Sequence, residues 1–476
     1  MVLADNRFNS TTAPMHTGGD FWHFGGILRS VLLHKLPDDG GVWPWRAYVF
    51  PRPGALGDVA INITVSTGSF SGQVPYSLQF DGGDTVEGQL RVVDGVGAIP
   101  HISVPKPRAW SLSSPEMHTV AVAIGGGRVV ERFGLRSWGV DAATSRITLN
   151  GEVVRLHGWN HHQQWPEGSG GKIGASPSAK QLDEDIALLL EGGANYVRGG
   201  HYPQDQRWLD RLDEKGFAMW EETLGPGVSV PNLNDWTYFM KYQLQQIDEM
   251  MLQSLNHPSI MTWGFFNEGP SSDPAACPGY AAAAARVQGL DPSRFVTWAT
   301  NSQLNDKCLE HATLISFNYY PAWYNSVGDL DAPAHAWNHY ADGVRSRFPG
   351  VPFVISETGA GGIYEWTSND TDAKWTLKYQ SEVLGADVDV AMSNRNISGV
   401  TLWHFFDFKG NDADTKRCGQ CDLVPGSDPP LCRWVDVRCG RPGGLNHKGV
   451  VDPWRRKKPA FDVVAAKYKA ADFFVV

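Results

Sequence analysis

The chain has 476 residues, of which 42% are hydrophobic and 19% are charged, as expected for a globular protein with two or three domains. Its formal charge of −10 argues against nucleic acid or an anionic membrane as the main partner. No apolar run approaches the roughly 20 residues of a membrane span. The 19 Trp and 14 Tyr suit a carbohydrate binder, because aromatic rings stack on the apolar faces of sugars, although most of them must belong to the core.

The first part of the chain, residues 1–50, contains a single good strand, Ile27–His34, after the turn DFWHFGG. One strand without partners makes a poor domain. Residues 51–140 differ, because short alternating segments such as VAINITVST and HTVAVAIG are separated by Gly, Pro and Asp. This spacing predicts a small β-sandwich.

In residues 141–476, strands alternate with amphipathic helical stretches, which predicts a (β/α)₈ barrel. A doubly wound sheet is the alternative, but it would not gather polar residues at all of the strand ends. The predicted strands are Val153–Trp159, Asn195–Gly200, Phe217–Glu221, Ile260–Asn267, Phe295–Thr300, Leu314–Tyr319, Phe353–Ser356 and Val400–Phe406. The predicted helices are Ser178–Glu191, Gln206–Lys215, Asp235–Leu255, Ala276–Gln288, Ala334–Arg347, Ala373–Ala391 and Pro459–Ala471.

Two of the predicted strands are apolar runs followed directly by a single glutamate. The run IMTWGFFN is followed by Glu268, and the run PFVIS is followed by Glu357. Active sites of α/β barrels lie at the carboxyl ends of the strands, and two carboxyl groups are the minimum for hydrolysis of a glycosidic bond. Either glutamate alone could be a solvated residue at a strand end, whereas the pair favours catalysis.

Other classes of hydrolase lack their motifs in this sequence. His161, His162 and His201 could be assembled around zinc, but no HExxH occurs. No GxSxG of a serine hydrolase is present, and the glycines before Lys172 are too few for a phosphate-binding loop. The remaining predicted strand ends carry hydrogen-bonding and aromatic groups, which suit a sugar.

Five segments, in barrel order, resemble glycoside hydrolase family 2, which includes β-galactosidases and β-glucuronidases. They are LHGWNHHQ, NYVRGGHYPQDQRWLDRLDEKGFAMWEE, WGFFNEG, VISETGAGG and LWHFFDF. DFWHFGGILRSV is similar to the end of the family's N-terminal jelly roll, and RFGLRSW to the end of its immunoglobulin-like domain. The resemblance implies a jelly-roll remnant over 1–50, an immunoglobulin-like β-sandwich over 51–140 and the catalytic barrel over 141–476.

The same resemblance implies that most of the jelly roll is missing before DNRF. No signal peptide is visible in MVLADNRFNST. If a signal was lost with the jelly roll, the protein is secreted or reaches a lysosome-like compartment, and otherwise it is cytoplasmic.

By this resemblance Glu268 is the general acid/base and Glu357 the nucleophile of a retaining exo-β-glycosidase. Because the nucleophile must stay ionised, we expect Arg198, or the hydroxyl of Tyr319 or Tyr320, beside Glu357. The acid must keep its proton near neutral pH, and apolar walls together with the charge of Glu357 would raise the pKa of Glu268.

The resemblance also implies contacts to the sugar. Asn267 is expected to bind the 2-hydroxyl, Trp403 to form a wall of the pocket and Asp20 to reach the sugar from the N-terminal domain. Alternatively, Trp403 could be a core residue at the end of the barrel, and Asp20 could cap a turn. The other substrate-binding residues implied are His162, Arg198, His201, Glu222, Tyr319, Tyr320 and Tyr324.

The identity of the sugar is less clearly indicated. Asn446 and Lys448, in LNHKGVVDPW, resemble a pair that holds the uronic carboxylate, and a Lys ammonium suits that role. Some galactosidases of the family keep a similar stretch, and RGGHYPQDQRWLD looks galactosidase-like. We therefore expect a β-glucuronidase, with a β-galactosidase as the alternative. A sugar-binding pseudoenzyme is the alternative of another class, and turnover of a chromogenic glycoside would discriminate it.

Residues 409–444 are a Gly-, Pro-, Asp- and Cys-rich insertion after the last barrel strand. Cys418, Cys421, Cys432 and Cys439 could form two disulfides, bind structural zinc or remain free thiols. We expect the insertion to shape the rim of the pocket. No cofactor is required by the proposed chemistry; a magnesium or sodium ion occurs in some relatives, but its ligands cannot be placed here. Homo-oligomers are common in the family, and the sequence does not reveal this chain's own state.

Overall fold

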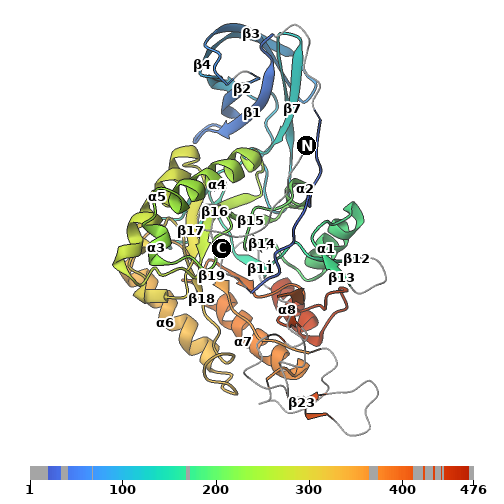
Figure 1. Cartoon of the computed structure of the whole chain (residues 1–476), viewed down its shortest axis with the longest axis vertical. Helices are drawn as coiled ribbons and strands as arrows, with labels where there is room; N and C mark the ends of the chain where they lie inside the picture. The colour runs from blue at the N-terminus through green and yellow to red at the C-terminus, as the bar shows by residue number, and fades with distance from the viewer. Residues whose placement is uncertain are drawn as a thin grey trace.

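The computed structural model describes residues 20–33, 41–66, 68–167, 172–363, 374–410, 422–423, 432–434, 441 and 444–470. Within them, an antiparallel β domain stands at one end of the molecule and a barrel of strands and helices forms the rest (Figure 1). Cys418, Cys421 and Cys439 lie outside the described residues, and only the backbone of Cys432 is described. The predictions for these four cysteines therefore stay predictions.

The β domain is one seven-stranded antiparallel sheet in the order β1-β2-β5-β4-β3-β6-β7. Burial alternates along β2, so that Ile61 and Ile63 point into a core of the domain's own. The sheet curls so that its edge strands meet, and Arg46 of β1 pairs with Glu131 of β7 at 2.7 Å. The assignment of this domain to the immunoglobulin-like class stays a prediction. The strands are β1 (Pro44–Pro51), β2 (Asp58–Val65), β3 (Gly72–Phe80), β4 (Thr85–Val93), β5 (Val96–Ser103), β6 (His118–Ile124) and β7 (Gly127–Phe133).

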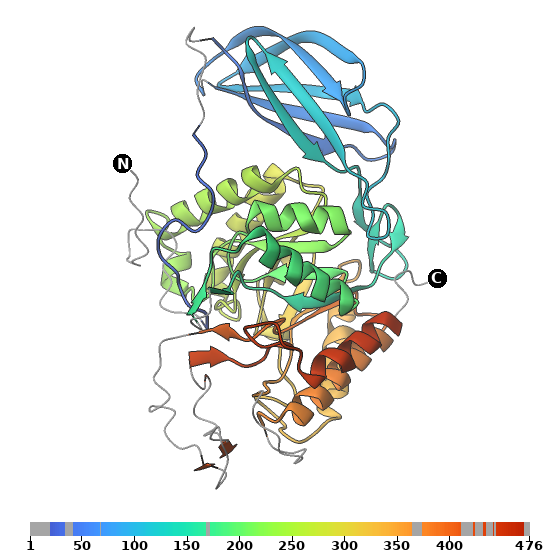
Figure 2. The same ribbon diagram turned by 90° about the vertical axis from the view of Figure 1, so that its right-hand side faces the viewer.

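The β domain is fastened to the barrel by polar contacts. The side chain of Asn256 accepts from Val49 N at 2.9 Å and donates to Ala47 O at 2.8 Å. Trp110 donates its indole N–H to Asp213 O at 2.9 Å. A small antiparallel sheet follows the β domain in the chain and leads into the barrel (Figure 2); it consists of β8 (Trp138–Val140), β9 (Ile147–Leu149) and β10 (Glu152–Val153).

Eight parallel strands form the barrel, which confirms the predicted barrel fold. The sheet order is β17-β16-β15-β14-β11-β20-β19-β18, and a bridge between Thr300 and Phe317 brings the two end strands together. Every residue of these strands is buried, as is usual for parallel strands covered by helices. The strands are β11 (Leu156–Asn160), β14 (Tyr196–Gly199), β15 (Ala218–Glu222), β16 (Ile260–Asn267), β17 (Phe295–Ala299), β18 (Ile315–Asn318), β19 (Phe353–Glu357) and β20 (Gly399–Leu402).

The helices surround the barrel strands close to their predicted positions. Ser178 begins α1 with a capping box to Gln181, and Gly216 ends α2 in the left-handed region at φ 73°. Thr376 caps α7 by accepting from Tyr379 N, so this helix begins later than predicted. The helices are α1 (Ala179–Glu191), α2 (Gln206–Lys215), α3 (Val230–Leu233), α4 (Phe239–Ser254), α5 (Cys277–Leu290), α6 (Ala332–Arg347), α7 (Leu377–Ser393) and α8 (Pro459–Ala470).

Short elements border the mouth of the barrel. Two hairpin-like pairs, β12 with β13 and β21 with β24, lie beside it, and β22 pairs with β23 in the insertion. They are β12 (Trp165–Glu167), β13 (Lys172–Gly174), β21 (Phe408–Lys409), β22 (Asp422–Leu423), β23 (Cys432–Trp434) and β24 (Leu445–Asn446). Among the described residues, no helix is long and apolar enough to cross a membrane.

The predicted strand Ile27–His34 is wrong over its described part, residues 27–33, which has no regular secondary structure. Among the strands that the structure describes, none pairs with this segment, and Leu33 is 99% exposed. The segment from residue 20 runs along the outside of the barrel (Figures 1 and 2). Two hydrogen bonds hold it in place. The backbone N–H of Trp22 donates to Lys409 O, and the side chain of Arg29 donates to Gln163 Oε1 at 2.8 Å.

A disulfide joins Cys277, at the start of α5, to Cys308, in the loop after β17. The sequence analysis did not predict it, because the two cysteines are 31 residues apart and form no motif. The bridge fastens together the two chain segments that follow β16 and β17.

Candidate active site

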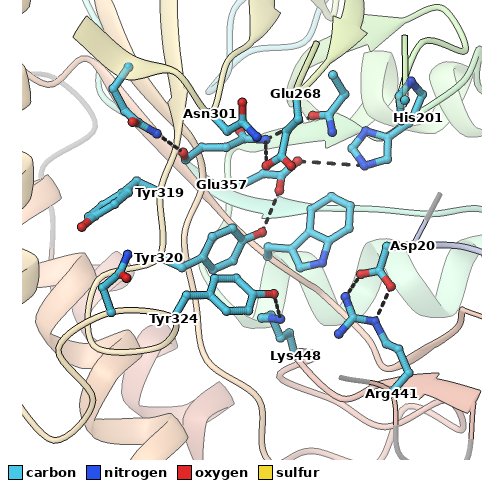
Figure 3. A pocket seen from close by; sticks show the side chains of 17 residues that line it. Asp20, His201, Glu268, Asn301, Tyr319, Tyr320, Tyr324, Glu357, Arg441 and Lys448 are labelled. Carbon is cyan, nitrogen blue, oxygen red and sulfur yellow. Dashed lines mark hydrogen bonds and ion pairs between the residues drawn. The ribbon is translucent and has the colours of Figure 1, made fainter. Parts of the chain in front are cut away.

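A cavity of about 600 Å³ opens at the carboxyl ends of the barrel strands (Figure 3). Glu268 directly follows β16 and Glu357 is the last residue of β19, so the two strand ends deliver both carboxyl groups to this cavity. The lining residues are Asp20, His201, Pro226, Gly227, Asn267, Glu268, Asn301, Gln303, Asn318, Tyr319, Tyr320, Tyr324, Asn325, Glu357, Trp403, Arg441 and Lys448.

Arg198, on β14, is fully buried and holds two of the carboxylates in place. Its Nη1 donates to Glu357 Oε1 at 2.7 Å and to Asn160 Oδ1 at 2.9 Å. Its Nε and Nη2 donate to Glu222 at 3.1 and 3.0 Å, and Nη2 also donates to Asn267 Oδ1 at 2.9 Å. The charges of Glu222 and Glu357 outweigh the effect of burial and raise the pKa of Arg198. The guanidinium is therefore a fixed positive charge.

Both carboxylate oxygens of Glu357 accept hydrogen bonds. Arg198 donates to Oε1, and the hydroxyl of Tyr320 donates to Oε2 at 2.7 Å. His201 Nε2 lies 4.0 Å from Oε1. These donors suit the ionised form that a nucleophile needs. The expected neighbours of Glu357 are thus confirmed for Arg198 and Tyr320. Tyr319 lines the cavity, and its backbone N–H, not its hydroxyl, donates to the backbone O of Glu357 at 3.0 Å.

Glu268 has the opposite environment. It faces the open cavity, yet the surrounding protein removes it from bulk water, and this burial raises its pKa to about 7, with the negative charge of Glu357 adding to the rise. One donor is present, since Asn318 Nδ2 donates to Glu268 Oε1 at 3.0 Å. The expected direction of the pKa shift is confirmed. Glu268 can therefore hold a proton near neutral pH.

The side chain of Asn267 is oriented by its neighbours. Its Oδ1 accepts from Arg198 and from Asn318 Nδ2 at 2.9 and 3.1 Å. Asn318 is held in turn by Ser356, whose hydroxyl donates to Asn318 Oδ1 at 2.7 Å. Since the oxygen of Asn267 is occupied, its amide N–H₂ group remains for a ligand in the cavity.

Lys448 lies at one end of the cavity within a group of aromatic rings. Its ammonium donates to Tyr324 Oη at 2.9 Å and lies 5.4, 5.2 and 4.9 Å from the ring centroids of Tyr320, Trp323 and Tyr324. Burial lowers the pKa of Lys448 well below its ordinary value, and the nearby charge of Arg441 lowers it further. An anionic group in the cavity would be attracted here and would favour the charged ammonium.

Asp20 reaches the cavity from the N-terminal segment. It forms an ion pair with Arg441, which belongs to the predicted insertion, and it accepts from Asn446 Nδ2 at 2.8 Å. Asn446 Oδ1 accepts from Lys448 N at 3.1 Å. Asn446 is buried and does not line the cavity, so it acts as a connection between Asp20 and Lys448.

Four predicted substrate-binding residues lie behind the cavity wall. His162, Arg198, Glu222 and Asn446 are buried and contact lining residues instead of lining the cavity themselves. Trp403 does line it, and its ring stacks on His201 with centroids 5.0 Å apart. The predicted residues that line the cavity are Asp20, His201, Asn267, Glu268, Tyr319, Tyr320, Tyr324, Glu357, Trp403 and Lys448.

The sequence analysis named several lining residues as candidates and missed others. Arg441 was missed because it lies in a Cys-rich stretch without a helix or strand pattern. Gln303 and Asn325 lie in loops after β17 and β18, where only the fold brings them to the cavity. Asn301 and Asn318 are among the hydrogen-bonding groups that the sequence places at the ends of the predicted strands, and both line the cavity.

A metal site is not found at this cavity among the described residues. Within the described part of the chain, one group of side chains is close enough together to hold an ion, Asp210, Asp213 and His257, and none of the three lines the cavity. His257 Nδ1 and Asp213 Oδ2 are 2.6 Å apart, and the charge of Asp213 contributes to a raised pKa of His257. The hydrogen bond between His257 and Asp213 accounts for the closeness of these two side chains without an ion.

A barrel that presents an ionised carboxylate beside a carboxyl group with a raised pKa has the site of a glycoside hydrolase. Comparison with known sequences agrees. The family described as "Glycosyl hydrolases family 2, TIM barrel domain" matches residues 140–429. This match covers more than half of the chain, and the chain belongs to glycoside hydrolase family 2.

Curated relatives carry the name β-glucuronidase. The chain is 26% identical to the enzyme of Chlorocebus aethiops over 88% of its own length and 67% of the relative's. It is 28% identical to that of Bacteroides fragilis over 86% of its length and 60% of the relative's. The chain thus spans about three fifths to two thirds of the relatives it matches.

Solved structures agree on the fold. A family 2 β-galacturonidase from Eisenbergiella tayi, bound to galacturonate, superposes with a TM-score of 0.84 at 26% identity, over 99% of this chain and 79% of that one. A β-D-glucuronidase from Dictyoglomus thermophilum superposes with a TM-score of 0.71 at 20% identity, over 90% of this chain and 69% of that one, and this likeness concerns the fold alone.

Proposed function

We propose that this protein is a retaining exo-β-glycosidase that removes a terminal β-linked glucuronic acid. Glu357 is the nucleophile and Glu268 is the general acid/base. The observation that carries the proposal is the contrast between the two carboxyl groups. Glu357 is held by Arg198 and Tyr320, whereas burial and the charge of Glu357 raise the pKa of Glu268 to about 7.

In the first step, an oxygen of Glu357 attacks the anomeric carbon and forms an ester with the sugar. Glu268 gives its proton to the glycosidic oxygen as the bond to the leaving group breaks. The charge of Glu357 is lost on ester formation, so the pKa of Glu268 falls. In the second step Glu268 takes a proton from water, the water oxygen attacks the anomeric carbon, and the ester bond breaks to restore Glu357 as a carboxylate.

Lys448 and Arg441 support the choice of an acidic sugar. Both are basic residues that line the cavity, and Tyr324 adds a hydroxyl beside Lys448. A uronate carboxylate in this part of the cavity would gain charge-assisted hydrogen bonds that the hydroxymethyl group of a neutral sugar cannot form. The names of the curated relatives support the same choice.

A second candidate is the hydrolysis of β-galacturonides. It is favoured by the likeness to the Eisenbergiella tayi enzyme, whose structure holds galacturonate. Galacturonate and glucuronate share the carboxylate and differ only in the configuration at C4. The β-galactosidase alternative is less well supported, because a neutral sugar would not form the charge-assisted hydrogen bond that a uronate carboxylate can form with Lys448.

The proposal extends to the two other parts of the chain. The strands β1 to β7 would be the immunoglobulin-like domain, and residues 20–33 the end of the sugar-binding jelly roll. In support, Asp20 lines the cavity and the ring of Phe21 lies 5.8 Å from that of His201, so this segment helps to build the site.

The test compares hydrolysis of the p-nitrophenyl β-D-glucuronide, β-D-galacturonide and β-D-galactoside by the wild type and by Glu357→Gln. We expect the glucuronide to be cleaved fastest and the variant to lose activity on all three substrates. Preference for the galacturonide would replace the first candidate by the second, and preference for the galactoside would contradict the proposed role of Lys448. Full activity of Glu357→Gln would overturn the two-glutamate mechanism.

A further inference from the structure

The backbone at Glu357 lies at the edge of the regular strand ladder. β19 pairs with β20 at Val354 and Ile355, before the glutamate is reached. Its pairing with β18 shifts register just before Asn318, which lies opposite Glu357. The ladder is therefore irregular where the carboxylate begins, and the position of Glu357 depends on contacts outside the sheet.

The residue after the glutamate supplies several of these contacts. Thr358 is fully buried and does not line the cavity. Its backbone O accepts from Trp403 N at 2.8 Å, and its hydroxyl donates to Asp387 Oδ2 at 2.9 Å. The backbone O of Glu357 accepts from Tyr319 N at 3.0 Å. These three hydrogen bonds hold the chain directly behind the carboxylate.

Asp387, on α7, is a buried carboxyl group that the proposed reaction does not use. Both of its oxygens accept, since Trp337 Nε1 donates to Oδ1 at 3.0 Å and Thr358 donates to Oδ2. Within the described part of the chain no cation pairs with it, and burial raises its pKa to about 7. A carboxyl group in such a place is costly, which favours a role that an apolar side chain could not fill.

Trp337, on α6, joins this carboxyl group to the other side of the strand end. Besides donating to Asp387, its ring packs edge-on against that of Tyr319, with centroids 6.2 Å apart. Tyr319 in turn donates to the backbone of Glu357. The contacts form a closed circuit that runs through Trp337, Asp387, Thr358, Glu357 and Tyr319. Two helices and the end of β18 thus restrain the backbone of one glutamate.

We propose that Asp387 is a positioning residue for the nucleophile, and that it acts through the hydroxyl of Thr358 to fix the backbone from which the carboxylate of Glu357 reaches the anomeric carbon. This role rests on the function proposed above. Neither Asp387 nor Thr358 lines the cavity, so neither touches the substrate. Their loss therefore slows the attack by Glu357, for which alignment is critical, and leaves substrate binding unchanged.

The chemistry of a hydroxyl partner provides a conservative replacement. A threonine hydroxyl can donate to a carboxylate and can also accept from an N–H group. In Asp387→Asn the amide oxygen can accept from Trp337 while the amide N–H₂ group donates to Thr358, so the contact is kept with its direction reversed. Asp387→Leu has a similar size and breaks it.

The test measures kcat and KM on the methyl β-glycoside of the sugar that the wild type cleaves fastest. Its poor leaving group makes attack by Glu357 the slow step. For Thr358→Val and Asp387→Leu we expect kcat to fall by about 10–100-fold with KM within about twofold of wild type, because a small displacement of a reacting group has an effect of this size. Thr358→Ser and Asp387→Asn, which keep the contact, should stay within about threefold of the wild-type kcat.

Thr223→Val is the matched control. Thr223 directly follows Glu222 at the end of β15, is buried, and accepts from Gln243 Nε2 of α4 at 2.7 Å. The replacement removes a buried hydrogen bond between a strand end and a helix, as Thr358→Val does. We expect the two variants to lose similar stability in urea, but kcat of Thr223→Val should stay within about twofold of wild type.

A second measurement isolates the attack by Glu357. On a 2-deoxy-2-fluoroglycosyl fluoride of the same sugar, Glu357 attacks the anomeric carbon, the C–F bond at that carbon breaks and fluoride leaves. The ester accumulates because fluorine at C2 slows its hydrolysis, and no proton from Glu268 is needed. We expect the rate constant of inactivation to fall at least about tenfold in Thr358→Val and Asp387→Leu, and to stay near wild type in Thr358→Ser and Asp387→Asn.

The outcomes separate the two proposals. If the wild type is active and Thr358→Val matches Thr223→Val in kcat and in its rate of inactivation, the positioning role is refuted and the glycosidase stands. If Asp387→Asn is as slow as Asp387→Leu, the hydrogen bond to Thr358 is not what Asp387 contributes, and the role is likewise refuted. If the wild type cleaves no glycoside, the proposed function fails and the positioning role fails with it. Should Asp387→Leu not fold, the comparison of Thr358→Val with Thr358→Ser decides.

Discussion

Arg198 donates to Glu357 at 2.7 Å and to Glu222 at 3.0 Å, so that one fully buried guanidinium behind the cavity wall pairs with two carboxylates. Burying a charge is costly unless it is paired, and here each of the three charges depends on the others. The geometry thus provides the proposed nucleophile, Glu357, with a fixed positive partner in a place where water is largely excluded.

Replacement of Arg198 by Met should therefore destabilise the fold as well as stop catalysis. We expect the free energy of unfolding in urea to fall by about 3–5 kcal/mol, because two buried carboxylates lose their partner. The control is Arg132→Met, which removes exposed ion pairs to Asp210 and Glu214 and should cost less than about 1 kcal/mol. Equal losses of stability in the two variants would contradict the role given to Arg198.

The raised pKa of Glu268 predicts the pH dependence of the reaction. The acid form is the active one, so kcat/KM should fall as the pH rises through about 7, the pKa that burial and the charge of Glu357 give to Glu268. A pH profile with the methyl glucuronide measures this limb. A profile that stays flat up to pH 9 would show that Glu268 is not the acid.

The same pKa makes a prediction for stability. A carboxyl group whose pKa is higher in the folded than in the unfolded state binds its proton more tightly when folded, so stability is lost as the pH rises from the unfolded pKa toward the folded one. Glu268→Gln cannot ionise. Its melting temperature relative to the wild type should therefore be higher at pH 8 than at pH 5, and an unchanged difference would argue against the raised pKa.

Glu268→Gln should also separate substrates by their leaving groups. We expect kcat/KM to fall by roughly 10²–10⁴-fold for the methyl glucuronide, whose leaving oxygen needs a proton. The p-nitrophenyl glucuronide, whose leaving group departs as a stable anion, should lose much less in the step that forms the ester. Equal losses on both substrates would favour a structural role for Glu268.

Lys448 should determine the preference for acidic sugars. Lys448→Met should lower kcat/KM on the p-nitrophenyl β-glucuronide by about 10–100-fold, since a hydrogen bond to a charged group contributes about 1.5–3 kcal/mol. The β-glucoside, which lacks the carboxylate, should be unaffected or cleaved faster, because burying the Lys448 ammonium is costly. Lys180→Met, at an exposed position on α1, is the control. A parallel fall on both sugars would remove Lys448 from recognition of the carboxylate.

Strand ends were the part of the site that the sequence predicted well. An apolar run that stops at Glu268 or Glu357 marks both the strand and its carboxyl end, so the fold and the proposed catalytic pair follow from one pattern. The pattern does not distinguish a side chain that faces the cavity from one behind it. His162 and Glu222 lie at strand ends as Asn267 does, yet both are buried behind the wall.

Contacts between distant segments could not be predicted. Arg441 reaches the cavity through the insertion and Asp20 through an N-terminal segment, and their ion pair joins residues that are 421 positions apart. The predicted strand from Ile27 was wrong because its apolar residues suggested a strand, whereas a strand also needs a neighbour to pair with. Among the described strands, none pairs with this segment.

The disulfide between Cys277 and Cys308 should stabilise the rim of the cavity on the side of the general acid. It closes a loop of 31 residues that includes Asn301, and Glu268 lies shortly before Cys277 in the chain. From the entropy of loop closure we expect about 2–4 kcal/mol of stabilisation. Reduction of the native protein should therefore lower its melting temperature. In the double variant Cys277→Ala, Cys308→Ala, reductant should have a smaller effect, and the melting temperature without reductant should already be low. If the double variant melts like the oxidised wild type, this bridge does not contribute to stability.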